Sequence, residues 1–113
     1  MPLELRRIIL FTPNLDALAD FYPDVLELRI IGREDGWVDF DAGGCRLALH
    51  LGPAKLGSRP PKLAFYAADV AAARERLINR GLTNAGPVKS TKAFDMCDCK
   101  DPDGNPFQIS SRA

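Results

Sequence analysis

The order of apolar stretches, helix caps and turns occurs twice in this sequence, and this repeat restricts the chain to a fold of two similar halves. In the first half, an apolar, β-branched stretch at residues 6–11 predicts a buried strand, and Asn14 then caps a helix. In the second half, a predicted strand at residues 62–66 is followed by the capping residue Asp69. A shift of 55 residues (62 − 7) superimposes the two halves and places Arg7 on Lys62, Phe11 on Tyr66 and Asn14 on Asp69.

Three short strands are expected after each helix, separated by turns rich in glycine, proline and aspartate. The predicted strands are residues 28–31, 37–40 and 45–51 in the first half, and 87–89, 94–100 and 107–110 in the second. A shift of 60 residues aligns the late hairpins and places Asp41 on Asp101, Gly44 on Gly104 and Leu47 on Phe107. Chance similarity is the alternative, but agreement of caps, strands and hairpins in one order favours duplication.

Each half therefore reads strand, helix, strand, strand, strand, which predicts an α+β fold of duplicated βαβββ modules that form an open, curled mixed sheet. We expect one domain over residues 1–113, with modules at about 3–52 and 60–112. Such a small domain buries only about two-thirds of its unfolded surface, so we also expect a homodimer.

Several residues indicate where the elements end. Pro23 lacks an N–H group and predicts that the first helix ends or kinks near Tyr22, whereas Gly81 lies just past the second helix. Turns are expected at residues 32–36 and 43–44. The stretch at 101–105 lacks the alternating acidic ligands and terminal glutamate of a calcium loop, so it is also interpreted as a turn.

The balance of charge argues against several classes of partner. The chain has 15 basic residues (Lys and Arg) and 15 acidic residues (Asp and Glu), so its net charge is zero. No basic or acidic tail stands out in the sequence. This composition disfavours nucleic acid and anionic membranes as partners. No apolar run approaches the roughly 20 residues that span a bilayer, and no export signal is visible, so we expect a cytoplasmic protein with reduced cysteines.

The duplicated order and its motifs resemble the vicinal oxygen chelate superfamily of glyoxalases, bleomycin resistance proteins and dioxygenases. The motifs that carry the resemblance are Asn14-Leu15-Asp16, Phe21-Tyr22, Val25-Leu26-Glu27-Leu28, Phe40-Asp41-Ala42-Gly43-Gly44 and Asp101-Pro102-Asp103-Gly104-Asn105-Pro106-Phe107. Two residues depart from it, namely Pro23, where the family often has a basic residue, and Glu27, where it often has glycine. The resemblance implies that the strand faces turned away from the helices line a cleft.

The resemblance also implies four metal-ligand positions, which here hold Arg7, Ala48, Lys62 and Gln108. The repeat supports this placement, because it pairs Arg7 with Lys62 and Ala48 with Gln108. Arginine stays protonated, lysine would have to lose its proton, alanine has no donor atom, and a lone amide oxygen is a weak ligand. Catalytic sites for divalent metals need about three His, Asp, Glu or Cys ligands, so we expect no metal and no cofactor.

Strand alternation supplies a set of residues that could line the cleft. The candidates are Arg7, Phe11, His50, Lys62, Tyr66, Asp95, Cys97, Cys99 and Gln108. Two cations beside aromatic groups suit a small, partly aromatic ligand with a carboxylate or phosphate. In the competing interpretation, Arg7 or Lys62 pairs with Asp95 or another acid and closes the site.

Cys97 and Cys99 lie two residues apart and therefore share a face of one strand. Two thiolates so placed could hold a soft metal ion or an arsenical, whereas two buried thiols would pack as small apolar groups. His50 is the only histidine, and no nucleophile is paired with it by spacing. Trp37 and Phe40 are expected on opposite faces of their strand, one in the core and one in the cleft or an interface.

The leading hypothesis is a metal-free protein that binds or sequesters a small molecule, similar to the bleomycin-resistance branch. One alternative is an enzyme with a non-standard site, such as His50 with Asp95, or a thiol. The others are a soft-metal protein built on Cys97 and Cys99, and an interaction module without a small ligand. The sequence leaves the identity of the ligand and any remaining catalysis open.

Overall fold

The structure of this protein is a computed structural model that describes residues 2–113, and it divides into two compact units at Lys55 and Leu56. Module 1 contains β1 (Arg7–Thr12), α1 (Leu15–Leu26), β2 (Arg29–Glu34), β3 (Trp37–Asp41) and β4 (Arg46–Leu51). Module 2 contains β5 (Leu63–Tyr66), α2 (Val70–Asn79), β6 (Ala85–Ser90), β7 (Asp95–Lys100) and β8 (Pro106–Ser110).

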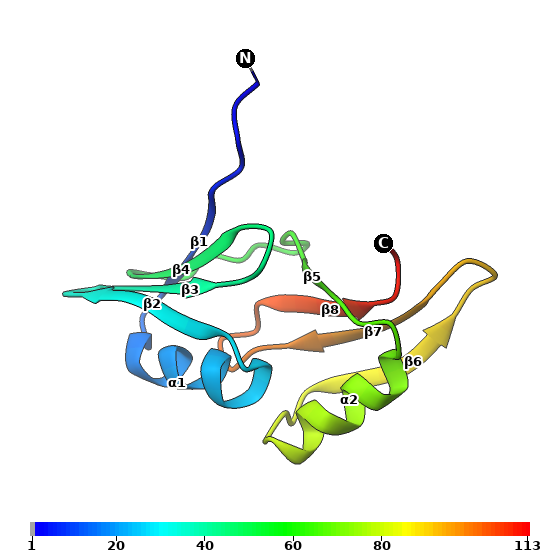
Figure 1. The fold of residues 1–113 in the computed structure, drawn as a ribbon. Coiled ribbons are helices and arrows are strands. Elements are labelled where there is room, and N and C mark those ends of the chain that lie inside the picture. Colours follow the sequence, from blue (N-terminus) through cyan, green and yellow to red (C-terminus); the bar gives the residue numbers. More distant parts are fainter. Residues whose placement is uncertain (1) are drawn as a thin grey trace. The chain divides into compact units, whose positions relative to one another are not determined.

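Each module holds one four-stranded mixed sheet and one helix (Figure 1). The strand order is β1-β4-β3-β2 in module 1 and β5-β8-β7-β6 in module 2. In both sheets the first strand runs parallel to the fourth and the other neighbours are antiparallel. The predicted α+β fold of duplicated βαβββ modules is therefore confirmed.

In module 1, α1 covers one face of the sheet and determines which strand residues are buried. Its residues Leu18, Ala19, Tyr22 and Val25 are buried, and the Tyr22 ring lies 5.8 Å from that of Phe40. Phe40 is paired with Leu47 and points to α1, whereas Trp37 is paired with His50 and points to the other face. The two aromatic residues thus lie on opposite faces, as the sequence predicts.

In module 2, α2 contacts β6, β7 and β8, and the core is smaller. The Phe65 and Phe107 rings meet edge to face at 6.1 Å, and Val70, Cys97 and Ile109 are buried. Arg74 on α2 donates from Nε to the carbonyl of Gly86 at 2.8 Å. A Cβ at Gly86 would lie 2.9 Å from the Asp98 carbonyl oxygen, so this close approach of β6 to β7 requires glycine.

The two helices begin where the sequence predicts but are capped differently. The Asp69 side chain accepts a hydrogen bond from the Ala72 amide at 3.0 Å, which is ordinary N-capping. The Asn14 side chain makes no capping hydrogen bond, and the Thr12 hydroxyl instead accepts from the Asn14 amide at 3.0 Å. Gly81 has a φ of 114° just past α2, as expected for a C-terminal glycine.

The predicted end of α1 near Tyr22 is wrong, because the helix continues through Pro23 to Leu26. Proline removes a single backbone donor, and burial of Val25 beyond it outweighs that loss. The helix then ends at Glu27, with φ 60° and ψ 28°, and the Leu28 amide donates to the Tyr22 carbonyl at 3.1 Å. A left-handed residue at this position is typical of a helix C-terminus.

The predicted turn at residues 32–36 is also partly wrong. β2 extends to Glu34, and Gly32 lies inside the strand at a break in register between Ile30 and Gly32. A glycine inside a strand marks a bulge as often as a turn. Separately, no helix among residues 2–113 is long and apolar enough to cross a membrane.

Replacing Glu27 with glycine should stabilise the protein. Glu27 is the one described non-glycine residue with a positive φ, and this conformation costs an L-residue about 1 kcal/mol that glycine avoids. We expect E27G to be more stable than E27A by about 1 kcal/mol in urea unfolding. E27A is the matched control, since both variants lose the carboxylate and only one relieves the backbone; equal stabilities would contradict the argument.

Candidate functional site

The sheet face of module 1 that is turned away from α1, which we call the open face, has its side chains in three rows. Strand register places three residues from β1, β4 and β3 side by side in each row. The guanidinium row is Arg7, Arg46 and Asp41; the middle row is Ile9, Ala48 and Asp39; the aromatic row is Phe11, His50 and Trp37.

Asp39 holds the cations of the open face in place. Its carboxylate accepts from Arg7 Nε at 3.2 Å and pairs with Arg7 Nη2 at 3.1 Å, which is a bidentate contact. Arg46 Nη1 lies 3.9 Å from the same carboxylate. Asp39 is only 6 % exposed, whereas the Arg7 and Arg46 side chains are 30 % and 48 % exposed. One buried acid thus organises two cations that still reach solvent.

The aromatic row is a continuous ring surface. The His50 ring lies 5.3 Å from that of Phe11 and 5.6 Å from that of Trp37, and the Arg7 guanidinium lies 5.8 Å from the Trp37 ring centre. Phe11 is half exposed. His50 thereby contributes a flat, polar surface between two apolar rings.

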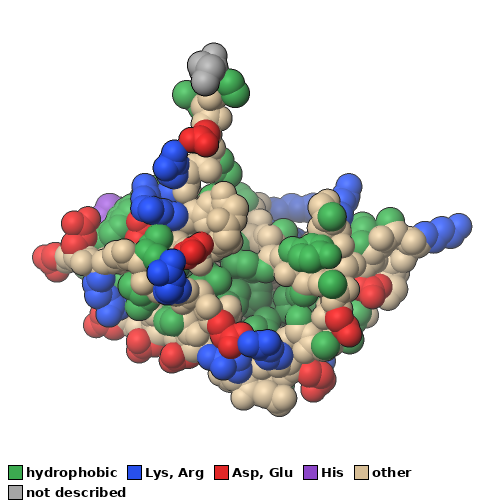
Figure 2. Space-filling view, in the orientation of Figure 1, with side chains coloured by type: hydrophobic (Ala, Val, Ile, Leu, Met, Phe, Trp, Pro, Cys, Tyr) green, Lys and Arg blue, Asp and Glu red, His purple; other side chains and the backbone are tan. Residues whose placement is uncertain are grey.

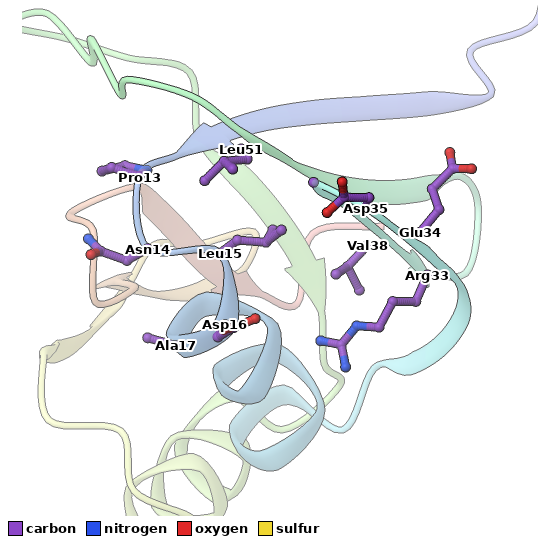
Figure 3. A pocket seen from close by; sticks show the side chains of 11 residues that line it. Pro13, Asn14, Leu15, Asp16, Ala17, Arg33, Glu34, Asp35, Val38 and Leu51 are labelled. Carbon is purple, nitrogen blue, oxygen red and sulfur yellow. The ribbon is translucent and has the colours of Figure 1, made fainter.

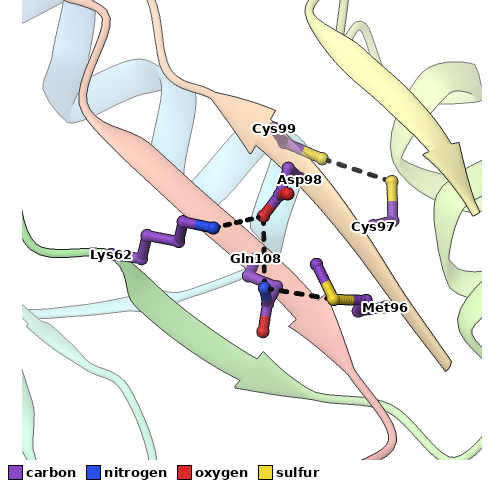
Figure 4. A network of polar contacts seen from close by, with 6 residues as sticks. All are labelled: Lys62, Met96, Cys97, Asp98, Cys99 and Gln108. Atoms are coloured by element: carbon purple, nitrogen blue, oxygen red, sulfur yellow. Dashed lines mark hydrogen bonds and ion pairs between the residues drawn. The ribbon is translucent and has the colours of Figure 1, made fainter. Parts of the chain in front are cut away.

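Module 2 has a related network on the face turned away from α2 (Figure 4). Asp98 accepts from Lys62 Nζ at 3.0 Å and from Gln108 Nε2 at 3.1 Å. Burial would raise the pKa of Asp98, but the hydrogen bonds from Lys62 and Gln108 outweigh it and lower the pKa below its ordinary value. The ion pair is therefore present at neutral pH and is lost as the pH falls below about 4.

These two networks show what occupies the four positions implied by the family resemblance. Arg7 and Lys62 are each paired with an aspartate, Ala48 is fully buried, and Gln108 donates to Asp98. Among residues 2–113 no group of three or more His, Cys, Asp or Glu side chains could hold a metal ion. The donor set does not fit a divalent metal. The competing interpretation, in which Arg7 or Lys62 pairs with Asp95 or another acid, is met in its second form, because the partners are Asp39 and Asp98.

Asp39 and Asp98 are candidate site residues that sequence reasoning missed, and for Asp98 a difference in turn length explains why. Asp41 pairs with Arg46 across residues 42–45, whereas Lys100 pairs with Pro106 across residues 101–105. The turn of the second hairpin is one residue longer. A shift of 60 residues therefore superimposes β8 on β4, whereas a shift of 59 (98 − 39) superimposes β7 on β3. Placing Asp41 on Asp101 was therefore wrong by one residue, which is enough to reverse the faces of a strand.

Asp95, Cys97 and Cys99 do not lie on the face of Gln108, so their placement in the cleft is wrong. Register pairs Cys97 with Ile109 and Cys99 with Phe107, both buried, whereas Gln108 is opposite Asp98. Cys97 Sγ lies 3.2 Å from the Gly86 carbonyl that Arg74 of α2 also contacts. Figure 4 shows both thiols pointing away from Lys62.

Cys97 and Cys99 are buried thiols with little access to reagents. Their sulfur atoms lie 3.7 Å apart, and burial together with the neighbouring Cys97 raises the pKa of Cys99 to about 12. The thiolate of Cys99, which is the metal-binding and nucleophilic form, is therefore scarce at neutral pH. Buried packing is the interpretation that this geometry favours.

The structure places Tyr66 among the exposed residues of β5, opposite Ser110. A further pocket of about 600 Å³ lies beside the N-terminus of α1, lined among others by Leu15, Arg33 and Val38 (Figure 3). Val38 and Leu49 form a register pair on the α1 side of the sheet, so this pocket does not belong to the open face.

Comparisons with known proteins support the architecture. The sequence profile of the Glyoxalase/Bleomycin resistance protein/Dioxygenase superfamily matches residues 4–109. No curated protein sequence matches the chain significantly. Among solved structures, a fosfomycin resistance protein, FosX, from Mesorhizobium loti is similar, with a TM-score of 0.79 and 21 % identity over 100 % of this chain and 95 % of that one.

Two other solved structures have the same fold. A lactoylglutathione lyase from Agrobacterium tumefaciens has a TM-score of 0.77 and 21 % identity, covering 97 % of this chain and 94 % of that one. A glyoxalase/bleomycin resistance protein/dioxygenase from Nocardioides has a TM-score of 0.79 and 21 % identity, covering 97 % and 83 %. At this identity the structural similarities establish the fold alone.

Removing the two missed carboxylates should affect stability unequally. We expect D39N to lower the free energy of unfolding by about 2–3 kcal/mol, because it breaks a buried bidentate pair. D98N should cost less than about 1 kcal/mol, because the Asp98 side chain is 39 % exposed. Urea unfolding measures both, and a larger loss in D98N would show that burial does not govern these pairs.

Thiol titration should separate the three cysteines. Cys45 is partly exposed, whereas Cys97 and Cys99 are buried. We expect one thiol to react rapidly with Ellman's reagent in the native protein and three in denaturant. Raising the pH from 7 to 9 should not release Cys99, because its pKa of about 12 keeps it protonated. Three rapid native thiols would contradict the buried assignment.

Proposed function

This chain belongs to the glyoxalase/bleomycin resistance protein/dioxygenase superfamily, and from that premise we propose that it binds or sequesters a small anionic, aromatic molecule without a divalent metal. The observation that carries the proposal is the chemistry of the four implied ligand positions. Two cations, a methyl group and an amide stand where a divalent ion needs several anionic or imidazole donors.

Metal-dependent isomerase, dioxygenase and thiol-transfer reactions depend on a Lewis acid. Here the side chains at these positions provide positive charge directly, through Arg7 and Lys62. Each cation is held at 3.0–3.2 Å by an aspartate that reaches it across the intervening strand, β4 or β8, and still reaches solvent. Pre-organised cations of this kind bind anions, since little side-chain entropy remains to be lost.

The aromatic half of the proposal rests on the open face of module 1. Phe11, His50 and Trp37 present adjoining rings beside the Arg7 guanidinium. A few convergent polar groups next to aromatic surface are typical of small-molecule sites. The relatives named above include a resistance protein and a lyase. We therefore propose that a homodimer of this protein sequesters a small molecule.

The proposal is tested first by metal content. Untagged protein is loaded with excess Zn²⁺, Ni²⁺, Fe²⁺ and Mn²⁺, dialysed, and measured by elemental mass spectrometry. We expect less than about a tenth of an equivalent of any metal, because three suitable donors do not converge. A full equivalent would overturn the metal-free proposal and direct mutagenesis to His50, Asp39 and Asp98.

Ligand-observed NMR then tests the binding partner class. The probes are benzoate, phenyl phosphate, inorganic phosphate and benzyl alcohol, and we expect the aromatic anions to give the strongest transfer signals. The double variant R7Q/K62Q should lose these signals, because it removes both cations. The control is R33Q, an arginine on β2 away from both networks. Equal signals from benzyl alcohol and phenyl phosphate would contradict an anion-binding role.

A further inference from the structure

We propose that the open face of module 1 selects aromatic compounds whose ring is joined to a phosphate, sulfonate or carboxylate by a long spacer. The anion would bind at an arginine-lined pocket beyond the guanidinium row, and the ring would bind the aromatic row. This inference rests on the proposed function and adds the class of ligand and the residues that select it.

The anion end is a pocket of about 360 Å³ at one end of the sheet. Arg6, Arg29 and Arg46 line it together with Glu4 and Asp41, so its formal charge is three minus two, or +1. Arg6 is paired with Glu4 at 2.7 Å and Arg29 with Asp41 at 3.3 Å. Arg46 has a 3.9 Å contact with Asp39, and its charge also helps to lower the pKa of Asp41. These interactions leave most of its five donors for an incoming oxyanion.

Arg46 connects this pocket to the open face, because it belongs to the guanidinium row and also lines the pocket. Arg7 adds positive charge in the same row, but it does not line the pocket, and its bidentate contact with Asp39 holds its guanidinium toward Trp37. Arg46 is therefore the residue that determines preference for a charged ligand.

The spacing between the two ends follows from strand geometry. Arg46 and His50 lie on the same face of β4, four residues apart, which corresponds to about 13 Å. A ring attached directly to an anion cannot reach both ends, whereas a flexible spacer of about six atoms can. Ile9 is exposed in the middle row and offers apolar surface to such a spacer.

The chain contains its own reporter for this binding. Trp37 is the only tryptophan and it belongs to the aromatic row, so its fluorescence responds to a ring that stacks there. The probes are 6-phenylhexyl phosphate, its uncharged analogue 6-phenylhexanol, and phenyl phosphate, which lacks the spacer. We expect 6-phenylhexyl phosphate to bind at least about tenfold more tightly than either analogue and to change Trp37 emission.

Two variants test the anion end and the ring end of the site separately. R46Q should weaken binding of 6-phenylhexyl phosphate about tenfold and leave 6-phenylhexanol unchanged, because only the anion contact is lost. H50A should weaken both compounds, because the ring contact is lost. The matched control is R33Q, which removes an exposed arginine of the same sheet whose register partner, Val38, points to α1. Thermal unfolding of each variant confirms that it is folded.

The outcomes separate this inference from the broader proposal. If phenyl phosphate binds as tightly as 6-phenylhexyl phosphate, or if R46Q and R33Q behave alike, the two-ended site on module 1 is wrong, while anion binding elsewhere stands. If the protein instead takes up a full metal equivalent, the proposed function fails by its own test. A spacer-dependent affinity that is weakened in R46Q and in H50A but kept in R33Q supports the inference.

Discussion

Burial of one face of each sheet beneath a single helix is the constraint on which the rest of this structure depends. In module 1 the ring contact between Tyr22 and Phe40 fixes which face of β3 is buried. Alternation along the strand then forces Trp37 and Asp39 to the opposite face. In module 2, Phe107 and Cys97 are buried on the face beneath α2, and Gln108 and Asp98 are therefore turned away from it. The chemistry of the open faces follows from the packing of the buried ones.

Most of the architecture could be predicted from periodicity and the repeat, because apolar alternation reports burial directly. The first and last strands of each module, Asp69 as an N-cap and the opposed faces of Trp37 and Phe40 are found where the residues indicate. The end of α1 was not predictable from Pro23 alone, since tertiary packing of Val25 outweighs a local propensity. Likewise Gly32 marks a bulge rather than a turn.

The candidate site was predictable only in part, and the reason is positional. The first and last strands of the two modules were aligned correctly, so the placement of their residues could be predicted. The residues found on faces turned away from the helices are Arg7, Phe11, His50, Lys62 and Gln108. Asp98 was missed and the thiols were misassigned because the third strand depends on a turn whose length differs between the modules. Asp39 was missed because it meets Arg7 across β4, a relation that spacing along the chain does not show. Ion pairs between strands carry no periodic signature of their own. Only the register reveals that each cation has an acidic neighbour.

The unequal hairpins have a consequence for how the two halves of a duplicated domain can diverge. The extra residue of the 101–105 turn is contained in the turn itself, because Asp98 lies opposite Gln108 just as Asp39 lies opposite Ala48. The strands on both sides of the turn therefore keep the same faces buried, and each open face keeps an aspartate in the equivalent place. The turns of a duplicated domain can thus change in length, and acquire a surface chemistry of their own, while the side chains of both sheets stay in register.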